Sequence, residues 1–251
     1  MTAVLNLTQP HSWLSRLRTI MVLRGGQRHV MLPAAGVDVR GGRNTLHAGG
    51  GDWWLAGGAP TPVAVYQPKG AASLAASYVN LVNPGTYDAA PGVAPTLDAS
   101  GWVFNGSTQY LDTTYIMASV SASTIVRFSN SLEEAFAGVI GSRSSNGAVY
   151  YGITPYRSSV RHRFWISNGS YVDETPAVVS GTMAIAGSTG YVNGAPDSAL
   201  TISSVTGNSI KIASFMPTWG FWGGSIQAVV IYNTTLTAPQ VAAVSAAMAA
   251  L

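Results

Sequence analysis

The 251-residue chain contains no cysteine, which excludes a structural disulfide, a thiolate zinc site and a cysteine nucleophile. Charged residues are also scarce, at 9% of the chain against 47% hydrophobic residues. That balance is too apolar for a disordered chain. No apolar run approaches the roughly 20 residues that a membrane helix needs, so we expect no membrane insertion. The composition therefore predicts a folded protein, rich in tight turns or covered by neighbouring subunits.

The N-terminus lacks the pattern of a secretory signal. Arg16, Arg18 and Arg24 interrupt the stretch that would have to be its apolar core. If the protein acts outside a cell, we expect lysis or carriage on a particle to bring it there. The predicted location is the surface of a virion or another extracellular particle.

Carboxylates in a catalytic arrangement are missing as well. Retaining glycosidases need two carboxyl groups roughly 5 Å apart, but Glu133 and Glu134 are sequence neighbours and would face opposite sides of a strand. Asp173 and Glu174 have the same problem. No two histidines have metal-ligand spacing, and no G-x-S-x-G elbow is present. We therefore expect no enzymatic activity, and a glycoside hydrolase is the weakest of the functions considered.

What the sequence does contain is a series of short apolar strands separated by turns. They include residues 63–66, 102–104, 109–111, 123–128, 137–141, 148–153, 161–166, 183–186, 189–192, 210–213 and 225–232. Asn-Gly pairs at 105–106, 168–169 and 193–194 favour two-residue hairpin turns, which need positive φ. Such spacing predicts an all-β fold, a two-sheet antiparallel jelly-roll sandwich.

The end of the chain differs from this pattern. The continuous apolar run 228–231 indicates a central strand covered on both sides. Thr237 and Gln240 then fit a capping box, which predicts a short C-terminal helix. Val241, Val244 and Met248 fall at helical spacing and should dock on the sandwich.

Residues 1–60 are predicted to form an extended arm that contains strands, and residues 61–251 the jelly-roll domain. The arm is rich in glycine and too short to hold much core. It contains six arginines and two aspartates, which give it the basic charge of the chain. Those arginines are not interleaved with aromatic residues, so nucleic acid is disfavoured as a partner. We expect the arm to contact other copies in a homo-oligomer, or other proteins of a particle.

Three stretches together resemble the laminin-G-like, concanavalin-A-like jelly rolls found in secreted and bacteriophage proteins. They are residues 101–111 (GWVFNGSTQYL), 223–227 (GGSIQ) and 230–237 (VIYNTTLT). The resemblance covers roughly residues 61–251 and implies the fold but no one function, since this fold includes lectins, hydrolases and structural modules. It also leaves Ca²⁺ open as a cofactor, with Asp88, Asp98 and Asp112 as the oxygen ligands.

Aromatic side chains are the predicted ligand contacts, because sugar rings lie flat on exposed aromatic faces. The predicted contact residues are Trp219, Phe221, Trp222, Tyr151, Tyr156 and Arg163. Tyr150 adjoins the tyrosine group, and Trp165 lies near Arg163. Burial in the sandwich core is the alternative for each aromatic residue. Arg163 belongs to a basic stretch that either contacts an acidic sugar or phosphate or simply faces solvent.

Two functions remain open. The first hypothesis is a non-enzymatic structural protein of a virion or surface assembly, a bacteriophage capsid decoration or tail-associated protein that displays a lectin-like jelly roll. The alternative is a carbohydrate-binding module that attaches to host surface glycans through loop aromatics.

Overall fold

The computed structural model describes residues 20–24, 27–31, 51–158, 160–166 and 170–251. Strands β1 (Ile20–Arg24) and β2 (Gln27–Met31) pair antiparallel, with Ile20 opposite Met31. The chain divides into two units, residues 1–51 and residues 52–251. The predicted arm lies mostly outside the described residues, so its role in assembly stays a prediction.

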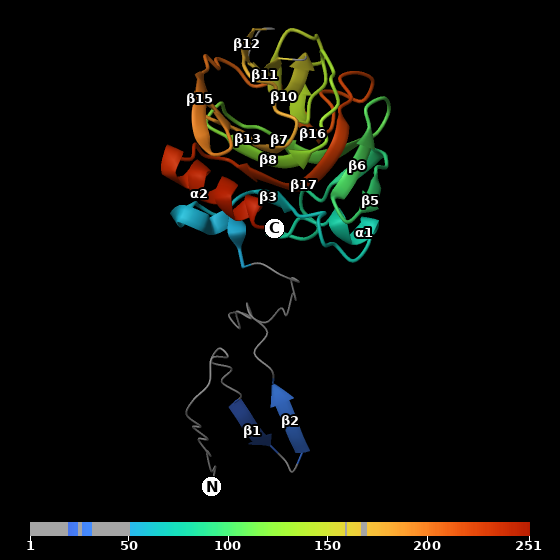
Figure 1. The fold of residues 1–251 in the computed structure, drawn as a ribbon, viewed down its shortest axis with the longest axis vertical. Helices are drawn as coiled ribbons and strands as arrows, with labels where there is room; N and C mark the ends of the chain where they lie inside the picture. The colour runs from blue at the N-terminus through green and yellow to red at the C-terminus, as the bar shows by residue number, and fades with distance from the viewer. Residues whose placement is uncertain (1–19, 25–26, 32–50, 159, 167–169) are drawn as a thin grey trace. The chain divides into compact units, whose positions relative to one another are not determined.

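Unit 52–251 is an antiparallel sandwich of two sheets, which confirms the predicted fold class (Figure 1). The seven-stranded sheet has the order β12 (Tyr171–Glu174), β11 (Arg161–Trp165), β10 (Tyr150–Ser158), β9 (Ile140–Arg143), β16 (Ser209–Ile212), β7 (Tyr110–Ile116) and β4 (Ala90–Val93). The eight-stranded sheet has the order β15 (Ala195–Ala199), β14 (Thr189–Val192), β13 (Gly181–Ala186), β8 (Ser123–Ser129), β17 (Gly223–Tyr232), β6 (Gly101–Asn105) and β5 (Thr96–Asp98), with β3 (Ala64–Tyr66) also paired to β17.

Strand β17 is the predicted central strand, and all ten of its residues are buried. Ile226, Val229 and Ile231 point into the core between the sheets. Val230 and Tyr232 point the other way, into a second apolar layer. The strand is covered on both faces, which explains why its sequence is continuously apolar.

The second layer is formed by two helices. Helix α2 (Ala238–Ala249) begins where the Thr237 N–H donates to Gln240 Oε1 at 2.9 Å, and it buries Val241, Val244 and Met248 as predicted. The 3₁₀ helix η1 (Trp53–Gly58) packs beside it and buries both of its tryptophans (Figure 1). Residues 52–60 were assigned to the arm and its linker, but the structure places them on the sandwich.

Turns and local helices complete the sandwich. Asn193 and Gly194 connect β14 to β15 with φ of 50° and 80°, the predicted two-residue hairpin turn. Helix α1 (Leu74–Ser77) is capped by Ser73, whose side chain accepts from the Ala76 N–H at 3.1 Å. None of the helices in the described ranges has the length and apolar character needed to span a bilayer.

Candidate functional site

The outer face of the seven-stranded sheet carries an aromatic cluster. On β10, Tyr151 and Ile153 point into the core, so Tyr150 points outward. Trp165, on the adjacent strand β11, points to the same face. Its ring centroid lies 5.1 Å from that of Tyr150 in a stacked arrangement. Tyr171 on β12 extends the row, with its centroid 5.7 Å from that of Trp165. Three adjacent strands thus present aromatic faces on one side of the sheet.

A loop between β16 and β17 covers part of this face and is held there by Phe215. The Phe215 ring lies directly over the backbone of Gly141 and Gly152, where an added Cβ would be 2.6 Å from the ring at either position. The Phe215 centroid is 5.5 Å from that of Trp165 and 5.9 Å from that of Trp219. Glycine in these two strands therefore allows the close approach that positions Trp219 over the sheet.

The cluster surrounds a hollow of about 540 Å³. Its lining residues are Phe136, Gly147, Ala148, Tyr150, Arg157, Arg163, Trp165, Tyr171 and Trp219. Phe136 and Tyr171 are each 50% exposed at its rim, whereas Trp165 is 4% exposed. The Trp165 N–H donates to Thr154 Oγ1 at 2.7 Å, which fixes the indole. The hollow thus combines exposed aromatic edges with a rigid floor.

Arg163 is held inside this site by Asp173. Its Nε and a terminal nitrogen donate to the two Asp173 carboxylate oxygens at 2.5 and 2.8 Å. The guanidinium lies 3.3 Å from the Tyr171 ring centroid and 4.7 Å from that of Trp165. The hydrogen bonds from Arg163 hold the pKa of Asp173 below its ordinary value. Arg163 is only 2% exposed, so its orientation is fixed by the pair and the stacked rings.

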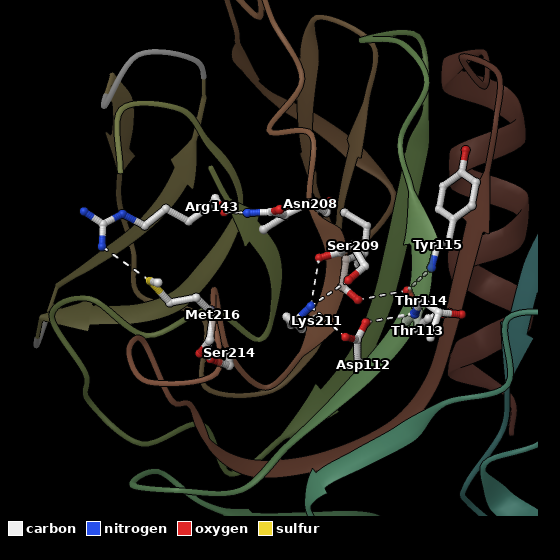
Figure 2. Close-up of polar contacts among 12 residues, drawn as sticks. Asp112, Thr113, Thr114, Tyr115, Arg143, Asn208, Ser209, Lys211, Ser214 and Met216 are labelled. Carbon is white, nitrogen blue, oxygen red and sulfur yellow. Dashed lines mark hydrogen bonds and ion pairs between the residues drawn. The ribbon is translucent and has the colours of Figure 1, made fainter. Parts of the chain in front are cut away.

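Two further arginines reach the hollow from neighbouring strands. The Arg143 guanidinium lies 4.9 Å from the ring centroids of both Tyr150 and Trp219. Figure 2 shows this side chain extended toward Met216, whose sulfur accepts from it at 3.5 Å. Arg157 is 3.8 Å from Asp173 Oδ2. Both guanidinium groups therefore lie beside aromatic or anionic groups of the cluster.

A bulge in β10 places Arg157 on this face. Thr154 is opposite Arg163, but Ser158 is opposite Arg161, so the register shifts between the two pairs. A regular strand would direct residues 154 and 157 to opposite faces. The shift turns Arg157 toward the hollow that Arg163 also lines.

The structure brings together two of the six predicted contact residues, Trp219 and Arg163. Phe221 lies outside the hollow and packs 6.1 Å from Tyr110, centroid to centroid. Tyr156 is half-buried and does not line the hollow either. Neither residue supports the predicted ligand contact.

Trp222 and Tyr151 belong to the core, so ligand contact through them does not fit the structure. Trp222 is completely buried, and its N–H donates to Ser131 Oγ at 2.9 Å. Tyr151 is 2% exposed and its hydroxyl is 2.9 Å from Thr124 Oγ1. Burial raises the pKa of Tyr151 well above its ordinary value. Sequence neighbours alternate between faces of a strand, so Tyr150 lines the hollow while Tyr151 points into the core.

The site also contains residues that were not predicted as contacts, namely Phe136, Arg143, Tyr150, Arg157, Trp165, Tyr171 and Phe215. The sequence places Tyr150 and Trp165 near predicted contact residues, but it does not determine which face of the sheet their side chains occupy. Gly141 and Gly152 inside apolar strands were a usable signal, because glycine in a strand often marks a close approach. The approaching group here is Phe215.

The predicted calcium ligands do not assemble into a site. Among the described residues, no group of three or more acidic, histidine or cysteine side chains could hold a metal ion. Asp88 accepts from the backbone N–H of Asn80 at 2.8 Å, and Asp98 accepts from that of Ser100 at 2.6 Å. Asp112 is paired with the Lys211 ammonium at 2.9 Å (Figure 2). Each carboxylate thus accepts a hydrogen bond from a protein donor, and Ca²⁺ as a cofactor stays a prediction.

A second, smaller hollow of about 350 Å³ lies beside the eight-stranded sheet. Arg127, Gln227 and Ser129 contribute to its lining, and no tyrosine or tryptophan does. It therefore lacks the stacking surface of the first hollow.

Comparison with known proteins identifies folds only. No protein-family model and no curated sequence matches the chain. Domain 4 of an extracellular arabinanase from Geobacillus stearothermophilus, in complex with arabinotriose, is similar with a TM-score of 0.53 and 14% identity. That similarity covers 74% of this chain and 98% of that domain. The jelly-roll part of the predicted resemblance is confirmed, and its laminin-G and bacteriophage parts stay predictions.

Two sialidase structures are also similar. A Trypanosoma rangeli sialidase in complex with 2,3-difluoro-KDN gives a TM-score of 0.53 at 16% identity, over 74% of this chain. The similarity covers 33% of that enzyme, so the chain spans about a third of its length. The CBM40 domain of a Ruminococcus gnavus sialidase, bound to α2,3-sialyllactose, gives a TM-score of 0.45 at 15% identity, over 57% of this chain and 95% of that one.

Proposed function

We propose that unit 52–251 is a non-enzymatic carbohydrate-binding module whose ligand occupies the aromatic hollow. The observation that carries the proposal is the arrangement of half-exposed Phe136 and Tyr171 and partly buried Trp219 around a rigid floor. Sugar rings stack their C–H faces on such aromatic surfaces, while a few polar groups fix their orientation. The arabinotriose bound to the similar arabinanase domain makes a saccharide a reasonable first ligand class.

The chemistry of the lining supports binding without catalysis. None of the residues that line the hollow, as far as the chain is described, is an aspartate or glutamate. The nearby Asp173 is occupied by Arg163 and has a lowered pKa, the opposite of what a general acid needs. A pair of carboxyl groups for glycoside hydrolysis is therefore not provided by these residues.

The predicted role as a virion or assembly protein remains a separate prediction. It depends on residues 1–60, of which most lie outside the described ranges. A carbohydrate-binding module would also suit a protein displayed on a particle, so the two predictions are compatible. The glycan-binding role is preferred because described residues form its site.

The test is a glycan screen of the full chain that includes arabino-oligosaccharides, followed by calorimetry on the glycans that bind. We expect Trp219→Ala to weaken binding about 10- to 100-fold, the effect of removing one central aromatic contact. Phe221→Ala is the matched control, because it removes a half-buried aromatic from the same loop outside the hollow. The proposal fails if no glycan binds, or if both variants bind like the natural protein.

A further inference from the structure

The hollow is surrounded by an excess of positive charge. Arg143, Arg157 and Arg163 lie in or against it, and Arg161 is 3.9 Å from the same Asp173 carboxylate that Arg163 binds. In the described part of the chain, Asp173 is the single carboxylate ion-paired with Arg157, Arg161 and Arg163, and no ion pair of Arg143 is present there. Aromatic walls lower the local dielectric and strengthen the resulting field toward an anion.

The guanidinium groups are not equally satisfied. Arg163 donates two hydrogen bonds to Asp173. Arg157 and Arg143, in contrast, each have a buried Nε with no hydrogen-bond partner. The Arg157 Nε lies 3.8 Å from Asp173 Oδ2, and Arg143 donates only to the Met216 sulfur and the Gly147 carbonyl oxygen. Neither guanidinium therefore has a bidentate carboxylate partner like that of Arg163, and their charge is less compensated.

The guanidinium groups of Arg143 and Arg157 flank the aromatic rings from different sides. Arg143 is centred between Tyr150 and Trp219, and its terminal nitrogen is 3.4 Å from the Gly147 carbonyl oxygen at the edge of the hollow. Arg157 extends from the β10 bulge beside Arg163. A ring stacked on the aromatic surface would thus have a guanidinium within reach at its periphery.

Given the proposed function, on which this step rests, we propose that the hollow selects acidic saccharides, whose ring bears a carboxylate or a sulfate. Guanidinium groups bind such anions through paired, charge-assisted hydrogen bonds. Arg157 is the main selectivity residue, because it lines the hollow, its side chain is 27% exposed, and its contact with Asp173 is longer, at 3.8 Å, than the hydrogen bonds from Arg163. Asp173 holds Arg163 in place and thereby positions the neighbouring Arg157.

The test compares matched neutral and acidic probes by calorimetry on the full chain. The probes are lactose, 3′-sialyllactose and 3′-sulfated lactose, and trigalacturonate with its methyl ester. We expect at least one acidic probe to bind about 10- to 100-fold tighter than its neutral partner. The lactose derivatives distinguish carboxylate from sulfate. Raising the salt concentration should reduce this preference, because the added interaction is electrostatic.

Arg157→Gln should abolish the preference, so that each acidic probe binds no tighter than its neutral partner. Arg127→Gln is the matched control, since Arg127 also has a buried Nε without a partner but lines the second hollow. Equal binding of neutral and acidic probes would overturn the selectivity while leaving the glycan-binding function intact. Absence of binding to every probe would overturn both, and a preference that survives Arg157→Gln would overturn the role of that residue.

Discussion

Removal of Asp173 should destabilise the protein much more than removal of its partner Arg163. The reason is the difference in what each change leaves behind. Asp173→Ala leaves a guanidinium that is 2% exposed without its carboxylate. Arg163→Met removes that buried charge and fills its place with an apolar side chain, while Asp173 keeps Arg157 and Arg161 at 3.8 and 3.9 Å.

The expected magnitudes follow from this asymmetry. Breaking a buried ion pair by removing one partner costs about 3–5 kcal/mol, and the 14% exposure of Asp173 favours the lower end. We therefore expect Asp173→Ala to lower the free energy of unfolding by about 3 kcal/mol, or the Tm by about 6–12 °C for a domain of this size. Arg163→Met should cost about 1 kcal/mol, chiefly from lost contact with the aromatic rings.

Urea unfolding of the full chain without ligand, followed by tryptophan fluorescence, measures both values. Asp98→Ala is the control, because this exposed carboxylate accepts a hydrogen bond from the Ser100 N–H and from no other donor in the described residues. The substitution should change the free energy of unfolding by about 0.5 kcal/mol or less. Equal losses for Asp173→Ala and Arg163→Met would refute the argument, and so would a loss from Asp173→Ala no larger than that of the control.

Three further predictions concern other parts of the molecule. Hydrogen bonds from Arg163 lower the pKa of Asp173, so the contribution of this carboxylate to stability is present above the ordinary value of 3.8 and is lost as the pH falls through the lowered pKa. In urea titrations at decreasing pH, the free energy of unfolding of Asp173→Asn should therefore fall less steeply than that of the natural protein. Gly152→Val should displace Phe215 and weaken both folding and glycan binding in melting and calorimetric assays, whereas Gly51→Ala, with open space around its added Cβ, should change neither. Trp222→Ala should cost about 3–5 kcal/mol in urea unfolding, whereas the more conservative Trp222→Phe should keep glycan affinity because this side chain is completely buried.

Much of the fold could be predicted from local sequence patterns. The alternating runs, the Asn193-Gly194 turn and the capping box around Thr237 each act over a few residues, and the structure confirms all three. The exception is residues 52–60, where glycines suggested a linker. Trp53 and Trp54 instead fill the layer beside α2, a partner that lies far away in the sequence.

The candidate site was less predictable, because it depends on the order of the strands in the sheet and on which face of the sheet each side chain occupies. Tyr150 and Trp219 are distant in the chain and meet only because the loop after β16 folds back over β10. Arg157 faces the site because of a bulge, and simple alternation would have placed it on the other face. The aromatic residues could be identified as candidates from the sequence, but their sides of the sheet could not.

The layer formed by η1 and α2 determines how this unit can be attached to a support. Asp52 directly precedes η1. Leu251 follows α2, and its carbonyl oxygen accepts a hydrogen bond from Lys69 Nζ at 2.5 Å. Both residues thus lie in the layer on the outer side of the eight-stranded sheet, and strands β10, β11 and β12 lie on the opposite side of the sandwich (Figure 1). The aromatic hollow lies on the outer face of these three strands. If unit 52–251 is attached through this layer, we expect the hollow to face away from the support. An array of copies would then bind a multivalent glycan surface with higher avidity than a single copy.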